Sequence, residues 1–91
     1  MTDINQTLKD RGSRYGRFID HATITQRLKM VLYATSLDHL EDDQREALDM
    51  ICHKIGRIIN GDPNYADSWI DIAGYAKLVA DRLEEKAKHN G

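Results

Sequence analysis

Apolar side chains recur every three or four residues through most of this 91-residue chain, and no stretch alternates apolar and polar residues as a strand does. The longest apolar stripe lies in residues 42–60 and contains Leu48, Ile51, Cys52, Ile55, Ile58 and Ile59. Acidic residues open this segment, where a helix dipole favours negative charge, and Gly61 follows it as a helix stop. The pattern predicts an all-α fold with a core helix over about 42–60.

The same periodicity predicts a helix on each side of the core helix. One covers about 21–35 after Asp20 as its N-cap, and its stripe is Ile24, Leu28, Val31 and Leu32. The other covers about 65–87, and its stripe is Trp69, Ile72, Ala73, Ala76, Val79, Ala80 and Leu83. Because Gly61-Asp62-Pro63-Asn64 is a turn by composition, with Asn64 available as a cap, we expect an antiparallel hairpin with 42–60.

The first twenty residues carry a weaker pattern. A short helical segment is expected through Leu8, and residues 10–20, with two glycines and no clear period, are predicted to form a loop. Residues 88–91 are a polar tail. The whole of 1–91 is therefore interpreted as a single helical domain, with 21–87 as its core.

A chain of 10.4 kDa is small for a stable core. It buries only about 60–65% of its unfolded surface, so a homo-oligomer is expected. Trp69→Ala is predicted to cost about 3–5 kcal/mol by opening a core cavity. Met50, Tyr75 and Leu78 lie off the core stripes; they are either ordinary exposed apolar residues or part of a subunit interface.

Composition excludes several classes of protein. The lone Cys52 rules out an intramolecular disulfide, and no apolar run approaches the roughly 20 residues that span a bilayer. Because the N-terminus also lacks an apolar signal core, we expect a cytoplasmic protein without a membrane partner. Residues 1–35 hold six basic and three acidic side chains, giving +3, and residues 36–91 hold seven and twelve, giving −5. This balance disfavours duplex nucleic acid but leaves a small anionic ligand open.

The segment 11–18 combines arginines with aromatic residues. Its guanidinium groups suit phosphate contact and its rings suit base or ribose stacking, which makes Arg11, Arg14, Tyr15 and Arg17 candidate ligand-binding residues. The alternative is that Tyr15 and Phe18 only pin the segment to the core.

A second candidate cluster flanks the predicted hairpin. Asp67, Asp71 and Tyr75 share one side of the last helix, and the hairpin could bring Lys54 and Arg57 near Asp71. Either these groups form structural salt bridges, or Lys54 and Arg57 grip a phosphate while Asp71 orients them. Gly74, which costs about 1 kcal/mol relative to Ala in mid-helix, requires close packing or a ligand beside it.

The run HKIGRIINGDPNYADSWIDIAGYAKLV, together with Tyr15-Gly16 and Gln44, resembles small proteins of tailed phages and prophages. Their signature reads K-x-x-R, a short N-P turn and D-S-W-x-D-I-A-G-Y-A, and the match covers most of residues 11–85. More distantly, the arrangement is similar to the nucleotide-modification-associated domain and to MazG-like all-α nucleotide pyrophosphohydrolases. The resemblance implies a MazG-like helical hairpin and a nucleotide ligand.

MazG-type enzymes use E-E-x-x-E on one helix and E-x-x-D on the next to hold Mg²⁺. This chain has a shortened first motif, Asp42-Asp43-Gln44-Arg45-Glu46, and Ser68-x-x-Asp71 in place of the second. As a hydrolase, its catalytic and Mg²⁺-binding residues would be Asp42, Asp43, Glu46 and Asp71. The alternative is that the acids at 42–46 cap a solvated helix end. No histidine pair four residues apart indicates a transition metal, and no nucleophile with a relay is evident.

These observations lead to three hypotheses of function. The first is a phage protein that sequesters a nucleotide-type small molecule without chemistry, by analogy a sponge for a cyclic nucleotide or ADP-ribose immune signal, needing no cofactor. The second is a Mg²⁺-dependent nucleotide pyrophosphohydrolase, and the third is an inhibitor that binds a host enzyme through Met50, Tyr75 and Leu78. The residues expected to bind the ligand are Arg11, Arg14, Tyr15, Arg17, Lys54, Arg57, Asp67, Asp71 and Tyr75.

Overall fold

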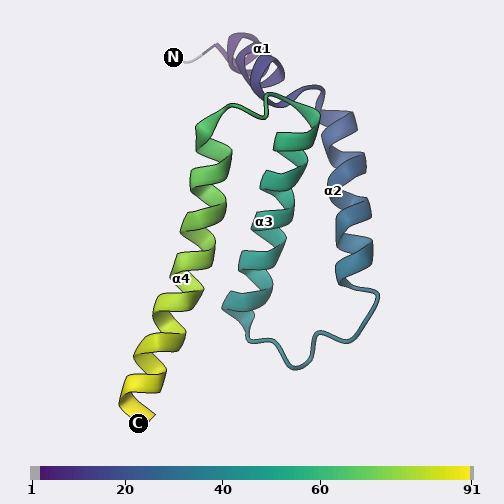
Figure 1. Cartoon of the computed structure of the whole chain (residues 1–91). Coiled ribbons are helices and arrows are strands. Elements are labelled where there is room, and N and C mark those ends of the chain that lie inside the picture. Colours follow the sequence, from purple (N-terminus) through teal and green to yellow (C-terminus); the bar gives the residue numbers. More distant parts are fainter. Residues whose placement is uncertain (1–2, 91) are drawn as a thin grey trace.

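A computed structural model describes the backbone of residues 3–90 and the side chains of residues 3–88. This part of the chain contains four helices and no strand: α1 (Ile4–Tyr15), α2 (Phe18–Leu32), α3 (Asp42–Asn60) and α4 (Ala66–Asn90). In Figure 1, α4, α3 and α2 stand side by side and α1 crosses their upper end. Since α2 and α4 each pack against α3 and not against each other, the three long helices form a single layer. The predicted all-α fold class is confirmed.

The helix boundaries agree with the prediction for α3 and differ elsewhere. The expected loop at 10–20 is wrong, because α1 continues through Tyr15 and α2 already begins at Phe18, leaving a break of two residues. Arg17, not Asp20, precedes α2, and Asp20 lies in its first turn. At the other end α4 reaches Asn90, so the polar tail continues the helix; Gly91 lies outside the described residues.

Two glycines allow the α1–α2 corner to dock on the end of α3. The side-chain amide of Asn60 donates to the carbonyl oxygens of Tyr15 and Arg17, both at 2.9 Å. A Cβ on Gly16, whose φ is +77°, would lie 2.3 Å from the Asn60 carbonyl oxygen, and one on Gly61 would lie 2.2 Å from the carbonyl oxygen of Arg14. Only residues without a side chain permit this approach.

The turn between α3 and α4 is held by its own polar groups. The Asp62 carboxylate accepts a hydrogen bond from the backbone N–H of Asn64 at 2.9 Å, and the indole N–H of Trp69 donates to the Pro63 carbonyl oxygen at 2.9 Å. Because α4 begins at Ala66, the residue before it is Tyr65 and not Asn64. The predicted cap at Asn64 is therefore wrong, although the antiparallel hairpin is present.

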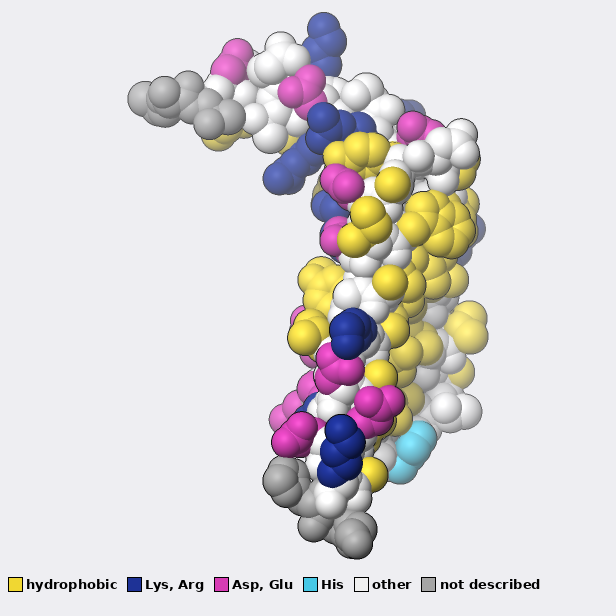
Figure 2. Space-filling view, turned by 60° about the vertical axis from the view of Figure 1, so that its left-hand side comes forward, with side chains coloured by type: hydrophobic (Ala, Val, Ile, Leu, Met, Phe, Trp, Pro, Cys, Tyr) yellow, Lys and Arg dark blue, Asp and Glu magenta, His cyan; other side chains and the backbone are white. Residues whose placement is uncertain are grey.

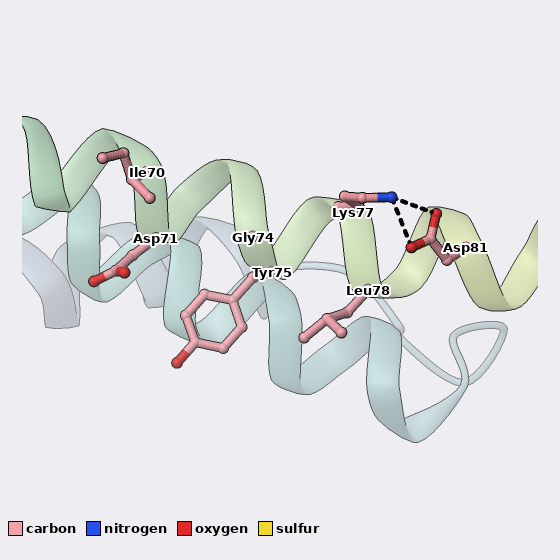
Figure 3. Close-up of a pocket in the computed structure, with 7 residues that line it drawn as sticks. All are labelled: Ile70, Asp71, Gly74, Tyr75, Lys77, Leu78 and Asp81. Carbon is pink, nitrogen blue, oxygen red and sulfur yellow. Dashed lines mark hydrogen bonds and ion pairs between the residues drawn. The ribbon is translucent and has the colours of Figure 1, made fainter.

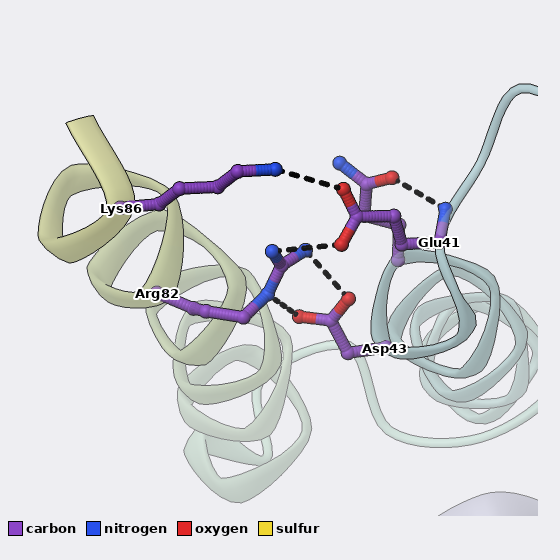
Figure 4. A network of polar contacts seen from close by, with 5 residues as sticks. Glu41, Asp43, Arg82 and Lys86 are labelled. Atoms are coloured by element: carbon purple, nitrogen blue, oxygen red, sulfur yellow. Dashed lines mark hydrogen bonds and ion pairs between the residues drawn. The ribbon is translucent and has the colours of Figure 1, made fainter. Parts of the chain in front are cut away.

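Polar and small residues occupy much of the space between the helices. On the α2–α3 side, the buried His21 and Thr25 pack against Gly56. On the α3–α4 side, Ser68 is buried and Lys54 pairs with Asp71 at 3.0 Å. At the lower end of the same contact, Arg82 of α4 binds Asp43 and Glu41 at the start of α3 (Figure 4).

The predicted apolar stripes do not meet in an enclosed core. Among the described side chains only Ala47 and Cys52 are buried apolar residues, and no large side chain is fully buried. Trp69 is 55% exposed and Val31 76% exposed, so the prediction that they belong to a core is wrong for the single chain. A single layer of helices encloses no volume, which also explains a radius of gyration of 16.0 Å where a compact chain of this length has about 12 Å.

None of the described helices combines the length and the apolar character that crossing a bilayer requires.

Candidate functional site

A pocket of about 550 Å³ opens where α1, α2 and α3 meet. We name it the arginine pocket; its polar and aromatic lining is Arg11, Tyr15, Arg17, Phe18, His21, His53 and Arg57. Leu8 and Ile19 add apolar surface. Three of the lining residues carry a guanidinium group and none carries a carboxylate. The pocket is therefore positively charged in a chain whose net charge is −2.

Stacked rings and guanidinium groups hold one wall of this pocket. The Arg57 guanidinium lies 4.2 Å from the centre of the Tyr15 ring, and Tyr15 meets Tyr65 edge to face at 6.0 Å. The Arg14 guanidinium in turn lies over the Tyr65 ring, 5.1 Å from the ring centre. Within the described residues Arg57 forms no ion pair with a carboxylate. Its charge is therefore oriented by an aromatic face and remains available to an anion.

Two histidines in contact with each other line the pocket. His21 Nε2 lies 3.3 Å from His53 Nδ1, and the rings meet edge to face with centroids 4.6 Å apart. Burial lowers the pKa of His53 to about 4, with further lowering by Arg57, His21, Lys54 and Lys29. Burial also lowers the pKa of His21. Both rings are therefore neutral at pH 7, and the positive charge of the pocket comes from its arginines alone.

The His21 ring is packed tightly and is not fully satisfied. His21 is 5% exposed, and its Nδ1 has no hydrogen-bond partner of normal geometry. The Gly56 backbone lies close to the ring and partly offsets the lowering of the His21 pKa by burial. The Thr25 hydroxyl lies 3.4 Å from Nε2. A buried ring nitrogen without a partner is uncommon, and here it belongs to a residue that lines the pocket.

The structure divides the nine residues expected to bind a ligand. Arg11, Tyr15, Arg17 and Arg57 meet in the arginine pocket. The others lie elsewhere: Arg14 stacks on Tyr65, Lys54 pairs with Asp71, and Asp67 interacts with the Tyr65 hydroxyl.

For Lys54 the structure favours the salt-bridge alternative. Its side chain is 11% exposed and its ammonium group lies 3.0 Å from an Asp71 oxygen. Figure 3 shows Asp71 and Tyr75 on the wall of a different, shallow hollow of about 510 Å³ along α4, which also includes Gly74 and Leu78. A Cβ added at Gly74 would have no atom within 4 Å, so close packing within the chain does not explain this glycine.

The acids required by the hydrolase alternative do not converge. Asp43 binds Arg82 through two contacts of 2.5 and 2.7 Å, and this guanidinium lowers the pKa of the Asp43 carboxyl (Figure 4). Asp71 instead pairs with Lys54 of α3. Lys54 comes eleven residues after Asp43, so the two acids are held at points about 16 Å apart along the axis of α3. Within residues 3–88, no three histidine, cysteine or acidic side chains are grouped as a metal ion would need.

Four residues at the site escaped the sequence reasoning. Phe18 begins α2 where a loop was expected, and it was considered only as a residue that pins that segment to the core. His21 lies in the helix predicted at 21–35 but had no assigned role, and His53 lies 32 positions from its partner His21. Asn60, which ties the α1–α2 corner to α3, had no recognised role. Its neighbour Gly61 and the pair Tyr15-Gly16 were the available signals, because glycines next to polar or aromatic residues often mark a close backbone approach.

Comparison with known proteins gives one match. A family model described as a domain of unknown function, DUF6378, matches residues 2–83 and so includes both the arginine pocket and the α3–α4 hairpin. No curated protein and no solved structure matches the chain.

Proposed function

Since the chain belongs to the DUF6378 family, whose function is unknown, we propose a function from the geometry: the protein binds a phosphate-bearing, nucleotide-type small molecule in the arginine pocket and does not transform it. One observation carries the proposal. Arg11, Arg17 and Arg57 line a single pocket that contains no carboxylate. Arg17 also lies 3.9 Å from Asp20 in an exposed, weak ion pair, whereas Arg57 forms no ion pair with a carboxylate among the described residues. Guanidinium groups that share a pocket without a carboxylate repel one another, and a bound anion reduces this repulsion.

The rest of the lining supports a ligand with a ring as well as a phosphate. Guanidinium groups bind phosphate oxygens through paired hydrogen bonds, and the faces of Tyr15 and Phe18 suit a base or a ribose. A volume of about 550 Å³ falls within the roughly 300–1,000 Å³ of pockets that bind small molecules.

The reactive groups near the pocket favour binding over catalysis. A general base works best when its pKa is near the operating pH, whereas burial lowers the pKa of His53 to about 4. Burial also raises the pKa of the Cys52 thiol, which makes it a poor nucleophile. The dispersed acids of α3 and α4 support the same preference over a Mg²⁺-dependent hydrolase.

The resemblance to small phage and prophage proteins supports a biological role for this binding. Such a protein would sequester a nucleotide signal of bacterial immunity, of the cyclic nucleotide or ADP-ribose type, inside the infected cell. The chemistry of the pocket favours a ligand with a phosphate and an aromatic or ribose ring, and the resemblance to phage proteins favours an infected bacterium as the place where it is bound.

Isothermal titration against cyclic dinucleotides, cyclic ADP-ribose isomers and mononucleotides tests the proposal. Arg57→Gln should weaken binding by about tenfold or more, because a hydrogen bond to a charged group is worth roughly 1.5–3 kcal/mol. Arg14→Gln is the matched control, since Arg14 stacks on Tyr65 outside the pocket, and it should bind within about twofold of the wild type. Failure of the whole panel to bind refutes the proposal, and release of pyrophosphate with Mg²⁺ would replace it with the hydrolase.

A further inference from the structure

The layer formed by α2, α3 and α4 has one strongly apolar side. On α3 the spacing of Leu48, Ile51 and Ile59 places them on one stripe, and on α4 Trp69, Ala76 and Leu83 do the same. A hollow of about 320 Å³ between the two helices is lined by Leu48, Ile51 and Ala76, so the stripes border the same groove. We name these six residues the open face; the apolar surface beside α4 is visible in Figure 2.

Five of the six residues of the open face are exposed in the single chain, Ile51 is half-buried, and none of the six carries a charge. Ile59 is 62% exposed and Trp69 is 55% exposed. Monomeric proteins rarely expose large apolar side chains together in one continuous patch. The α4 stripe continues through Ala73 and Ala80, so no charged residue interrupts it between Trp69 and Leu83. A covering partner therefore meets an apolar surface with no ions to desolvate.

The area of the chain indicates how much surface must be covered. Its accessible surface is 6930 Å², whereas a compact monomer of this mass exposes about 5,400 Å². The excess of about 1,500 Å² lies in the range that each subunit buries in an obligate homodimer, roughly 1,000–2,500 Å². The missing core is therefore about the size of one dimer interface.

We propose that the open face is covered by the open face of a second copy of this chain. Two three-helix layers then pack face to face around a two-fold axis, and their apolar stripes together form the hydrophobic core that neither layer has alone. A second copy fits because the surface is needed for folding itself, and an identical chain is the partner present wherever the protein is made. A neutral, apolar face also meets its own copy without repulsion.

This arrangement leaves the arginine pocket free. His53 and Arg57 each lie two positions from Ile55 along α3, which places them about 160° around the helix from the stripe that includes Ile51 and Ile55. The dimer therefore presents two pockets on its outer sides, and variants of the open face change assembly without removing a pocket side chain.

Sedimentation equilibrium of the full chain tests the proposal with Ala76→Glu and a matched control. Ala76 borders the hollow between α3 and α4 but is exposed in the single chain, so a glutamate there can extend into water unless a partner covers it. Leu78→Glu is the control: Leu78 is 68% exposed on the same helix, about 160° away. Wild type and Leu78→Glu should be dimers, and Ala76→Glu should lose the dimer, either as a folded monomer or by unfolding. A dimeric Ala76→Glu protein would overturn the proposal.

The single tryptophan gives an independent readout. In the dimer Trp69 is covered, so its emission should be blue-shifted and shielded from acrylamide, and both effects should be lost in Ala76→Glu. The melting temperature of the wild type should rise with protein concentration, because folding and assembly are coupled. A wild-type monomer with an accessible Trp69 and a concentration-independent melting temperature would also overturn it.

Discussion

The same substitution at two mid-helix glycines should have opposite effects on stability. Gly56 lies in α3 and Gly74 in α4. Replacing glycine by alanine in a helix interior gains about 1 kcal/mol from backbone entropy, whatever the surroundings. The surroundings then decide the sign of the total effect.

At Gly56 the added methyl group meets two buried side chains. Its Cβ would lie 2.6 Å from the Thr25 hydroxyl oxygen and 3.0 Å from two atoms of the His21 ring. Both side chains are buried, at 4% and 5% exposure. Overpacking of this kind costs about 1–3 kcal/mol, and displacing two buried polar groups places it at the upper end. After the helix gain, Gly56→Ala should lower the free energy of unfolding by about 1–2 kcal/mol.

At Gly74 nothing lies within 4 Å of the added Cβ. Gly74→Ala should therefore raise the free energy of unfolding by about 0.5–1 kcal/mol. Urea unfolding followed by circular dichroism, at one fixed protein concentration, measures both variants against the wild type. Stabilisation by Gly56→Ala would refute the packing argument at the α2–α3 contact. Destabilisation by Gly74→Ala would show that a partner or ligand approaches α4 at this point.

Two further predictions follow from the charged and titratable groups. The folded His53 takes up a proton only near pH 4, whereas the unfolded side chain does so near its ordinary 6.5, so stability should fall as the pH decreases through this window. Each unit of pKa shift is worth about 1.4 kcal/mol of folding stability, and the partial exposure of His53 reduces the total. His53→Gln should therefore remove about 1–2 kcal/mol of this acid destabilisation, measured as the difference between thermal melts at pH 7 and pH 4. If the variant loses as much stability between these pH values as the wild type, the lowered pKa of His53 is contradicted. Asp71→Asn leaves the buried Lys54 ammonium without its charged partner and should lower the free energy of unfolding in urea by about 1–2 kcal/mol. This cost is less than for a fully buried pair because the Asp71 side chain is 46% exposed. An unchanged free energy of unfolding would contradict a stabilising role of the Lys54–Asp71 pair.

The sequence predicted helices more accurately than the way they pack. Residues 42–60 were bounded correctly because signals at both ends agree: Gln44 accepts the backbone N–H of Glu41 at 2.8 Å, as in a capping box, and Gly61 stops the helix. The loop predicted at 10–20 was wrong because a helix tolerates Gly12, whose surroundings are open. The apolar stripe of α4 was identified, but periodicity does not reveal what covers a stripe, and Trp69 faces outward from the single layer.

For the site, chemistry was predictable and proximity was not. Arg11, Tyr15 and Arg17 were selected by residue type, and Arg57 joins them only because Asn60 docks the α1–α2 corner onto α3. The contact between His21 and His53 spans 32 residues, which no local spacing reveals. The sequence allowed Lys54 either to bind a phosphate or to form a structural salt bridge, and its ion pair with Asp71 favours the salt bridge.

NMR titration with inorganic pyrophosphate is the most direct test of phosphate recognition by the arginine pocket. The guanidinium signal of Arg57 and the imidazole signals of His53 should shift together and saturate, and the pKa of His53 should rise because a bound anion offsets the nearby arginines. Arg14, stacked on Tyr65 outside the pocket, should stay unchanged. If pyrophosphate leaves Arg57 and His53 unaffected, or shifts surface lysines and Arg14 to the same extent, the arginine pocket is not a phosphate site.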